Sequence, residues 1–393
     1  MYRSPTMTLI TKQDELTDFC HSLSSERFIT VDTEFMRENT YWPILCLVQV
    51  AGTETEGAID VMAPGIDLAP LFDLMKNKNI LKVFHAARQD MEIFYHLMGA
   101  LPAPIFDSQV AAMVCGFGDQ VSYENLVSKL TKARIDKSSR FTDWSRRPLS
   151  EKQISYALSD VTHLRDAYRK LEKNLEKTGR AGWLDAEMDI LTSPATYEAD
   201  PMQAHKRIKT RGAKPRAMAI LKELAAWREL EAQRRDMPRG RILRDDALVE
   251  IALHAPATAE ALGRTRGLSE RVANGNMGRE IIEAIKRGQA VPDDELPKPQ
   301  KRQEMPSGTG PVTELMKVLL KLKCEEQDVA QKLVASSSDI EKIAAFGEES
   351  GVNALEGWRF ELFGRDALRI RTGELGLAIR GDKLVLLENP NGD

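Results

Sequence analysis

The chain has 393 residues, of which 42% are hydrophobic and 29% are charged. This composition excludes a disordered or fibrous protein, and the length is sufficient for two or three domains that each bury a core. The net charge of −4, from 55 basic and 59 acidic residues, does not exclude a nucleic-acid partner, because a nucleic-acid enzyme needs only a local basic surface.

The first 192 residues alternate between strand-like and helix-like patterns. Strands are predicted at residues 28–32, 45–50, 57–60 and 80–84, and helices at residues 12–22, 68–75, 89–97, 107–115 and 152–176. Because the two kinds of element alternate, we predict an α/β domain with a mixed sheet over residues 1–192.

Two carboxylates lie on the first predicted strand. The run from Phe28 to Phe35 is rich in β-branched and aromatic residues, and successive side chains of a strand point to opposite faces. Asp32 and Glu34 are two residues apart, so they point to the same side.

Three further polar residues occur in two later segments. Asp90 follows a buried strand and falls early in a helix. Tyr156 and Asp160 are four residues apart in a predicted helix, which places the phenol and the carboxylate on one face, about 5 to 6 Å apart. Four carboxylates and one tyrosine from three segments can therefore form one site.

Such a site suits divalent metal ions. Mg²⁺ and Mn²⁺ prefer hard oxygen ligands and keep open positions for water and substrate phosphate. Two ions about 3.5 to 4 Å apart can make water nucleophilic, neutralise charge and stabilise the leaving oxygen when a phosphodiester is hydrolysed. Without ions the clustered carboxylates repel one another, and metal binding should relieve that repulsion.

The order and spacing of these residues resemble the DEDD exonuclease superfamily, in the subgroup that carries tyrosine in its third motif. The Asp-Thr-Glu-Phe motif at 32–35, the segment 85–90 and the Tyr-Ala-Leu-Ser-Asp motif at 156–160 resemble the bacterial ribonuclease D family. The resemblance covers most of the chain and implies a ribonuclease H-like exonuclease domain. It implies that two Mg²⁺ or Mn²⁺ ions are bound by Asp32, Glu34, Asp90 and Asp160, and that Tyr156 orients the attacking water or helps to deprotonate it.

The resemblance also implies an activity, that of a 3′–5′ exoribonuclease which releases 5′ nucleoside monophosphates, with tRNA precursors as substrates. A DNA exonuclease of the same superfamily is an alternative, because no motif residue distinguishes ribose from deoxyribose. A non-catalytic RNA-binding scaffold is the alternative from another class. The five polar groups argue against it, since a relic has no physical reason to keep them together.

Three residues beside the motifs are candidates for substrate binding. Phe35 could stack on a terminal base, or it could be a core aromatic residue. His85 and Gln89 could reach the scissile phosphate or a sugar hydroxyl, although a histidine at the end of a strand is more often a structural group.

The loop at residues 131–147 is a candidate wall of the substrate channel. It interleaves lysine and arginine residues, Arg140 among them, with aromatic residues such as Trp144. Cationic groups would neutralise phosphates, and the aromatic rings would offer stacking faces. The alternative is a solvated basic loop.

A helical region follows a predicted linker at residues 193–212. We expect its first helix to begin at Pro215 and a later helix to have Asp245 as its N-cap. Residues 213–291 resemble the HRDC domain, which implies a small helical bundle and an association with nucleic acid.

The same region is locally basic. Residues 206–244 contain 13 lysine or arginine residues against four acidic ones. We interpret this stretch as a second candidate contact with RNA.

Residues 292–311 are rich in proline, glycine and charged residues, which is typical of a second linker. The remaining residues, 312–393, have helical periodicity and resemble a second, divergent HRDC-like bundle. The predicted architecture is thus an α/β domain followed by two small all-α bundles.

Four cysteines, Cys20, Cys46, Cys115 and Cys324, are widely spaced and include no Cys-x-x-Cys pair. This pattern fits neither a disulfide framework nor a zinc site. No run has the length of a signal peptide's apolar region or of a membrane span. We therefore expect a soluble, cytoplasmic protein that does not associate with membranes and has no obligate protein partner.

Overall fold

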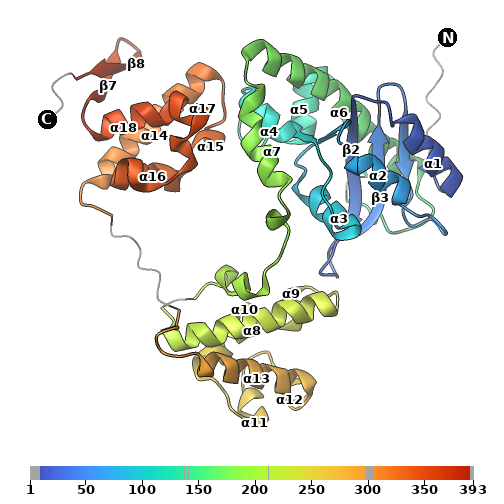
Figure 1. The fold of residues 1–393 in the computed structure, drawn as a ribbon, viewed down its shortest axis with the longest axis vertical. Helices are drawn as coiled ribbons and strands as arrows, with labels where there is room; N and C mark the ends of the chain where they lie inside the picture. Colours follow the sequence, from blue (N-terminus) through green and yellow to red (C-terminus); the bar gives the residue numbers. More distant parts are fainter. Residues whose placement is uncertain (1–8, 137, 140, 211, 298–304, 390–393) are drawn as a thin grey trace.

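The computed structural model describes residues 9–136, 138–139, 141–210, 212–297 and 305–389 (Figure 1). The N-terminal part is built on a six-stranded sheet with the order β1-β4-β3-β2-β5-β6. Its strands are β1 Leu9–Ile10, β2 Phe28–Met36, β3 Ile44–Ala51, β4 Glu56–Ile59, β5 Leu81–Phe84 and β6 Ile105–Asp107. Strands β2, β3 and β4 pair antiparallel and the other neighbours pair parallel, which confirms the mixed sheet.

Helices cover both faces of this sheet. They are α1 Gln13–Ser22, α2 Ala69–Lys76, α3 Arg88–Met98, α4 Ser108–Val114, α5 Tyr123–Thr131 and α6 Glu151–Thr178. The alternation of side chains along β5 shows the two layers, because Phe84 packs with α1, α2 and α3 whereas Val83 packs with α4, α5 and α6. The short strands β1 and β6 and the helix α5 were not among the predicted elements.

Helix α6 begins and ends at residues suited to those positions. The Ser150 hydroxyl and the Gln153 side chain form a capping box at its start, which satisfies N–H groups that have no partner within the helix. Gly179 ends it in the left-handed conformation, with φ 68°, which costs glycine little. The long helix therefore has a fixed register against the sheet.

A short connecting segment leads to the first helical bundle. It contains η1 Ala181–Leu184, α7 Asp185–Leu191, η2 Pro194–Thr196 and η3 Pro201–Arg207, and the bundle contains α8 Pro215–Arg234, α9 Arg239–Ile242, α10 Asp245–His254, α11 Ala259–Leu262, α12 Glu270–Ala273 and α13 Asn276–Ala290. The expected linker is partly ordered, because Ala204 and Ile208 pack into the core of the bundle. Helices α8 and α13 approach closely at Gly288, where a Cβ atom would lie 2.4 Å from the Cα atom of Ile220.

The predicted helix start at Pro215 is confirmed, whereas the one at Asp245 is shifted by a residue. Asp245 is the first residue inside α10, and Arg244 is the N-cap. The Asp245 carboxylate accepts a hydrogen bond from Arg228 Nη1 at 2.7 Å. Asp245 therefore forms an ion pair instead of capping the helix, and the sequence pattern alone does not distinguish these two roles.

The C-terminal region contains helices and one hairpin. Its elements are α14 Thr309–Gln327, α15 Gln331–Val334, α16 Ser337–Phe346, η4 Gly347–Ser350, η5 Asn353–Leu355, α17 Gly357–Arg359, the π-helical turn η6 Phe360–Gly364, α18 Arg365–Arg371, β7 Leu375–Arg380 and β8 Lys383–Glu388. The expectation of an all-α region was wrong for β7 and β8, which pair antiparallel. Their leucine-rich runs also suit a helix, and Gly381, with φ 61°, makes the turn that separates them. The domain limits given above stay a prediction.

Both helical regions contact the N-terminal α/β domain. Trp183 stacks on Trp358 of the C-terminal region, with ring centroids 4.2 Å apart, and Arg359 forms an ion pair with Glu187 at 2.7 Å. The first bundle instead holds the turn between β2 and β3, where the Tyr41 hydroxyl donates to the buried carboxylate of Glu229. Among the described residues, no helix combines the length and apolar character that a membrane span requires.

Candidate active site

Strand β2 directs two carboxylates toward helix α6. Thr30, which precedes Asp32 by two residues and so shares its face, donates from Oγ1 to the Val161 carbonyl oxygen of α6 at 2.8 Å. Asp32 lies opposite Gln49 and Glu34 lies opposite Leu47 in the β2–β3 ladder, and the register shifts immediately after Glu34. The strand thus ends its regular pairing directly beside the site.

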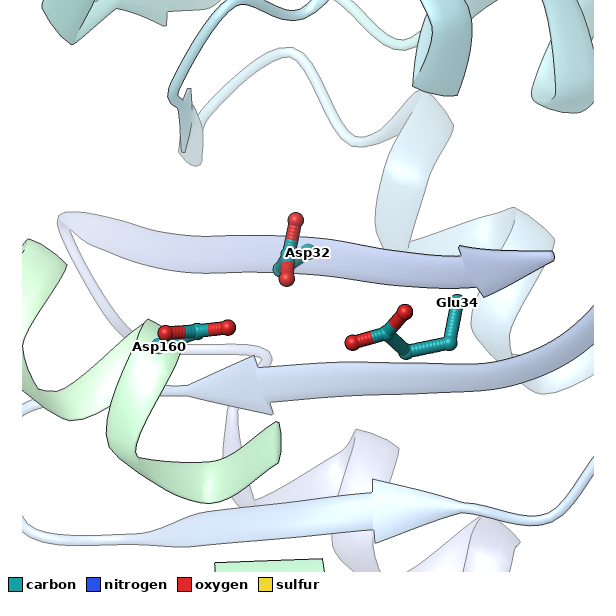
Figure 2. A group of neighbouring side chains, drawn as sticks. All are labelled: Asp32, Glu34 and Asp160. Carbon is teal, nitrogen blue, oxygen red and sulfur yellow. The ribbon is translucent and has the colours of Figure 1, made fainter. Parts of the chain in front are cut away.

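Asp160 completes a group of three carboxylates. Ligand oxygens of Asp32, Glu34 and Asp160 all lie within 4.8 Å of one another, and Figure 2 shows the carboxylates of the strand and of α6 facing a common space. This is the convergence that the two motifs predict. The group is compatible with a divalent cation, because it offers hard oxygen donors at ligand spacing.

Asp90 lines the same cavity but lies outside this group of three. It is 7% exposed, in the first turn of α3, and its Oδ1 accepts a short hydrogen bond from the Thr33 hydroxyl. The turn before α3 is fixed by Asp107, whose carboxylate accepts from the Ala86 and Ala87 N–H groups at 3.0 and 2.9 Å. Asp107 also caps α4 through the Gln109 N–H, so its role is structural.

The cavity has a volume of about 600 Å³, a size suited to a small ligand. Phe35, His85 and Gln89, the candidate substrate-binding residues, line it. His85 Nδ1 lies 2.9 Å from Ser108 Oγ, and its Nε2 is buried without a hydrogen-bond partner among the described residues. Arg140 lies outside the described residues.

Trp144 does not occupy the predicted place. Its side chain is 2% exposed and packs with Leu47 and Leu158, so it offers no stacking face to a nucleic acid. Its ring instead lies 6.2 Å from that of Tyr156. The loop follows this course because Arg147, three residues later, binds the Asp60 carboxylate through two nitrogens at 2.6 Å each.

Burial makes Asp32 and Asp90 hard to ionise, and repulsion by Asp32 adds to the effect at Asp90. Burial raises the pKa of Asp32 to about 6, and burial followed by the charge of Asp32 raises the pKa of Asp90 well above its ordinary value. No lysine or arginine in the described part of the chain lines the cavity. A bound cation would supply the missing positive charge, which is a second reason that this donor set fits a metal.

Tyr123 is a site residue that the sequence analysis missed. It lines the cavity, its hydroxyl donates to the backbone carbonyl of Asp160, and its ring lies 5.3 Å from that of His85. It therefore ties α5 to the turn of α6 that carries Asp160. A tyrosine at the start of an unpredicted helix carries no motif, so only the tertiary structure could identify it.

Comparisons with known proteins agree with this geometry. Residues 7–176 match the family model described as 3′-5′ exonuclease, and residues 217–285 match the HRDC domain. The chain is 50% identical over 382 residues to ribonuclease D of Nitrobacter hamburgensis, covering 97% of this chain and 100% of that protein. The chain belongs to the ribonuclease D family.

Other members of the ribonuclease D family extend the agreement. Ribonuclease D of Granulibacter bethesdensis is 47% identical over 386 residues, covering 98% of each chain. The crystal structure of Escherichia coli RNase D matches with a TM-score of 0.79 at 28% identity, covering 92% of this chain and 98% of that one. Family membership and the exonuclease domain together make the chain a 3′–5′ exoribonuclease, a hydrolase of phosphodiester bonds.

Tyr156 of this ribonuclease D site is expected to orient rather than to deprotonate. Burial, followed by the charge of Asp160, raises the pKa of the Tyr156 phenol above its ordinary value, so the group stays neutral and can donate a hydrogen bond. We expect Tyr156→Phe to lower kcat by roughly 100-fold with little change in KM, measured on a labelled RNA oligonucleotide. Tyr95→Phe is the control, since Tyr95 bonds to Glu198 and does not line the cavity. An unchanged kcat in Tyr156→Phe would remove the tyrosine from the mechanism.

Proposed function

We propose that this 3′–5′ exoribonuclease trims the 3′ ends of precursor tRNAs and releases 5′ nucleoside monophosphates. The observation that carries the proposal is the convergence of Asp32, Glu34 and Asp160 within 4.8 Å, beside a cavity that Asp32, Asp90 and Asp160 line. Binding of two Mg²⁺ or Mn²⁺ ions by these four residues is part of the proposal. The ions would supply an activated water and neutralise the charge that develops on the phosphate.

The residues around the carboxylates would position the RNA end. Phe35 could stack on the last base, because it lines the cavity beside the metal ligands. His85 offers an Nε2 without a hydrogen-bond partner among the described residues, which could bond to a phosphate or sugar oxygen. Tyr156 would hold the attacking water through its neutral hydroxyl.

The choice of RNA rests on relatives, and that of tRNA precursors rests on the family resemblance of the motifs alone. The Escherichia coli enzyme is described as an exoribonuclease involved in structured RNA processing, and the curated relatives are ribonucleases D. We place the enzyme in the cytoplasm, a proposal that the four free cysteines support, because such thiols persist in reducing compartments.

The test is cleavage of a 5′-labelled tRNA with a 3′ extension, by the wild type and by Asp160→Ala, with and without Mg²⁺ or Mn²⁺. A metal-dependent ladder that shortens from the 3′ end, absent in the variant, is expected. Faster cleavage of a matched DNA oligonucleotide would favour the DNA exonuclease. Tight binding without trimming under any metal would favour the RNA-binding scaffold.

A further inference from the structure

A second cavity lies in the first helical bundle, where η3, α8, α9 and the start of α10 meet. It has a volume of about 420 Å³. Its charged lining residues are Arg207, Arg228, Glu229, Arg239, Arg244 and Asp245. Four guanidinium groups therefore surround a pocket that contains only two carboxylates.

Two of these arginines are already paired. Arg228 Nη1 donates to the Asp245 carboxylate at 2.7 Å and to the Leu243 carbonyl oxygen at 2.8 Å. Arg239 binds both oxygens of the Glu229 carboxylate. These pairs hold the walls of the pocket in place and use both of its acidic groups.

The other two arginines keep their charge available. Arg207 and Arg244 are exposed, and neither forms a hydrogen bond or an ion pair with any residue in the described part of the chain. The pocket thus has four guanidinium groups against two carboxylates, an excess of positive charge that remains although Arg207 also interacts electrostatically with Glu229. Arginine is suited to this use, because its planar fork matches the oxygen geometry of phosphate.

Arg228 provides an independent observation. It is 5% exposed, yet its Nε is buried without a hydrogen-bond partner among the described residues. A buried donor of this kind costs free energy unless an acceptor reaches it. An oxygen of a bound anion in the pocket that Arg228 lines could be that acceptor.

We propose that this pocket binds a backbone phosphate of the RNA substrate, upstream of the 3′ end in the active site. RNA as the substrate rests on the proposed function. The link to the active site is Tyr41, whose hydroxyl donates to Glu229 and accepts from Arg239 Nη2 at 2.9 Å. Tyr41 is nine residues beyond Asp32 in the sequence, which spans at most roughly 30 Å of extended chain. That length corresponds to roughly nine stacked nucleotides.

The test compares Arg207→Gln/Arg244→Gln with a control variant of equal charge change, Arg264→Gln/Lys286→Gln. The control residues are exposed and paired with Glu260 and Glu283, and they do not line the pocket. Each pair is introduced into the full-length protein, and the Kd of a labelled 20-nucleotide RNA is measured in EDTA at several salt concentrations. A 4-nucleotide RNA is measured in parallel.

We expect the Kd of the long RNA to rise about tenfold in the pocket variant, and the slope of log Kd against log salt to fall by about 0.7, for one lost phosphate contact. The 4-nucleotide RNA should keep its Kd in EDTA and its cleavage rate in Mg²⁺, because the proposed contact lies upstream of the nucleotides that fill the active site. An unchanged Kd for the long RNA would overturn the proposal, and so would an equal loss on the short RNA.

One further measurement separates an RNA site from a site for a small free anion. Inorganic phosphate is titrated against thermal unfolding of both variants, and a loss of phosphate binding without any loss of RNA affinity would show a site for a small free anion instead. Binding in EDTA does not depend on cleavage, so a protein that binds long RNA through the pocket and never trims it would refute the proposed function while supporting this one.

Discussion

The Asp32→Asn variant should cleave RNA at least about a thousandfold more slowly than the wild type. The substitution removes the charge of a metal ligand, and that charge supports several kcal/mol of transition-state stabilisation. Asparagine has nearly the same shape, and Asp32 lies in the middle of β2, so the sheet should be unaffected. The measurement is the single-turnover rate on a 5′-labelled RNA in saturating Mg²⁺. Asp18→Asn is the control. Asp18 is exposed on α1, so this variant should cleave the RNA at the wild-type rate.

The same substitution should stabilise the metal-free protein at neutral pH. The pKa of Asp32 is raised from 3.8 to about 6 in the folded chain, so ionising this group opposes folding by roughly 2 to 3 kcal/mol. Asparagine carries no charge and avoids that cost. A variant that is inactive and also less stable in EDTA would indicate a structural role for Asp32, whereas an active variant would exclude it as a ligand.

Divalent metal should stabilise the protein much more at pH 7.5 than at pH 5. The folded pKa of Asp32 is about 6, above the unfolded value, so the folded chain holds more protons between about pH 4 and pH 6 and the free energy of unfolding falls as pH rises through that window. This decrease in the free energy of unfolding is complete above about pH 6, where the ionised carboxylates can also bind a cation. Metal that binds only the folded state then restores stability.

Thermal unfolding with Mg²⁺ and with EDTA at the two pH values checks this expectation. If the metal ion offsets the cost of about 3 kcal/mol for ionising Asp32 in the folded chain, Tm should rise by roughly 5 to 10 °C at pH 7.5. The rise at pH 5 should be much smaller. Asp32→Asn should remove most of the difference between the two pH values. Equal stabilisation by Mg²⁺ at both would mean that the ion binds elsewhere.

The sequence predicts the parts of the site that depend on local periodicity. Asp32 and Glu34 share a face because side chains alternate along a strand, and Asp160 falls where a long amphipathic helix packs on that face. The contact between Thr33 and Asp90 joins residues 57 positions apart, and no local pattern encodes it. The fold class follows in the same way, since the alternation of strands and helices is a local property.

At two places the structure differs from what the sequence predicts, and the reason differs between them. Trp144 was expected to face RNA because it lies in a basic loop, but an aromatic ring gains more by burial against Tyr156 and its neighbours than by exposure. Residues 375–388 form a hairpin although leucine suits a helix equally well, because a single turn at Gly381 decides between them. Tertiary packing settled the first case, and a local turn settled the second.

The turn between β2 and β3 limits how freely the parts of this enzyme can be exchanged. It begins after Met36, the last residue of β2 and two residues beyond Glu34, and at its tip the N–H groups of Tyr41 and Trp42 both donate to the Asp236 carboxylate of the helical bundle at 3.0 Å. Trp42 also stacks on His96 of α3, with ring centroids 4.1 Å apart. A helical bundle taken from another protein would lack the groups that bind this turn. A functional chimaera therefore has to exchange the turn and the bundle together.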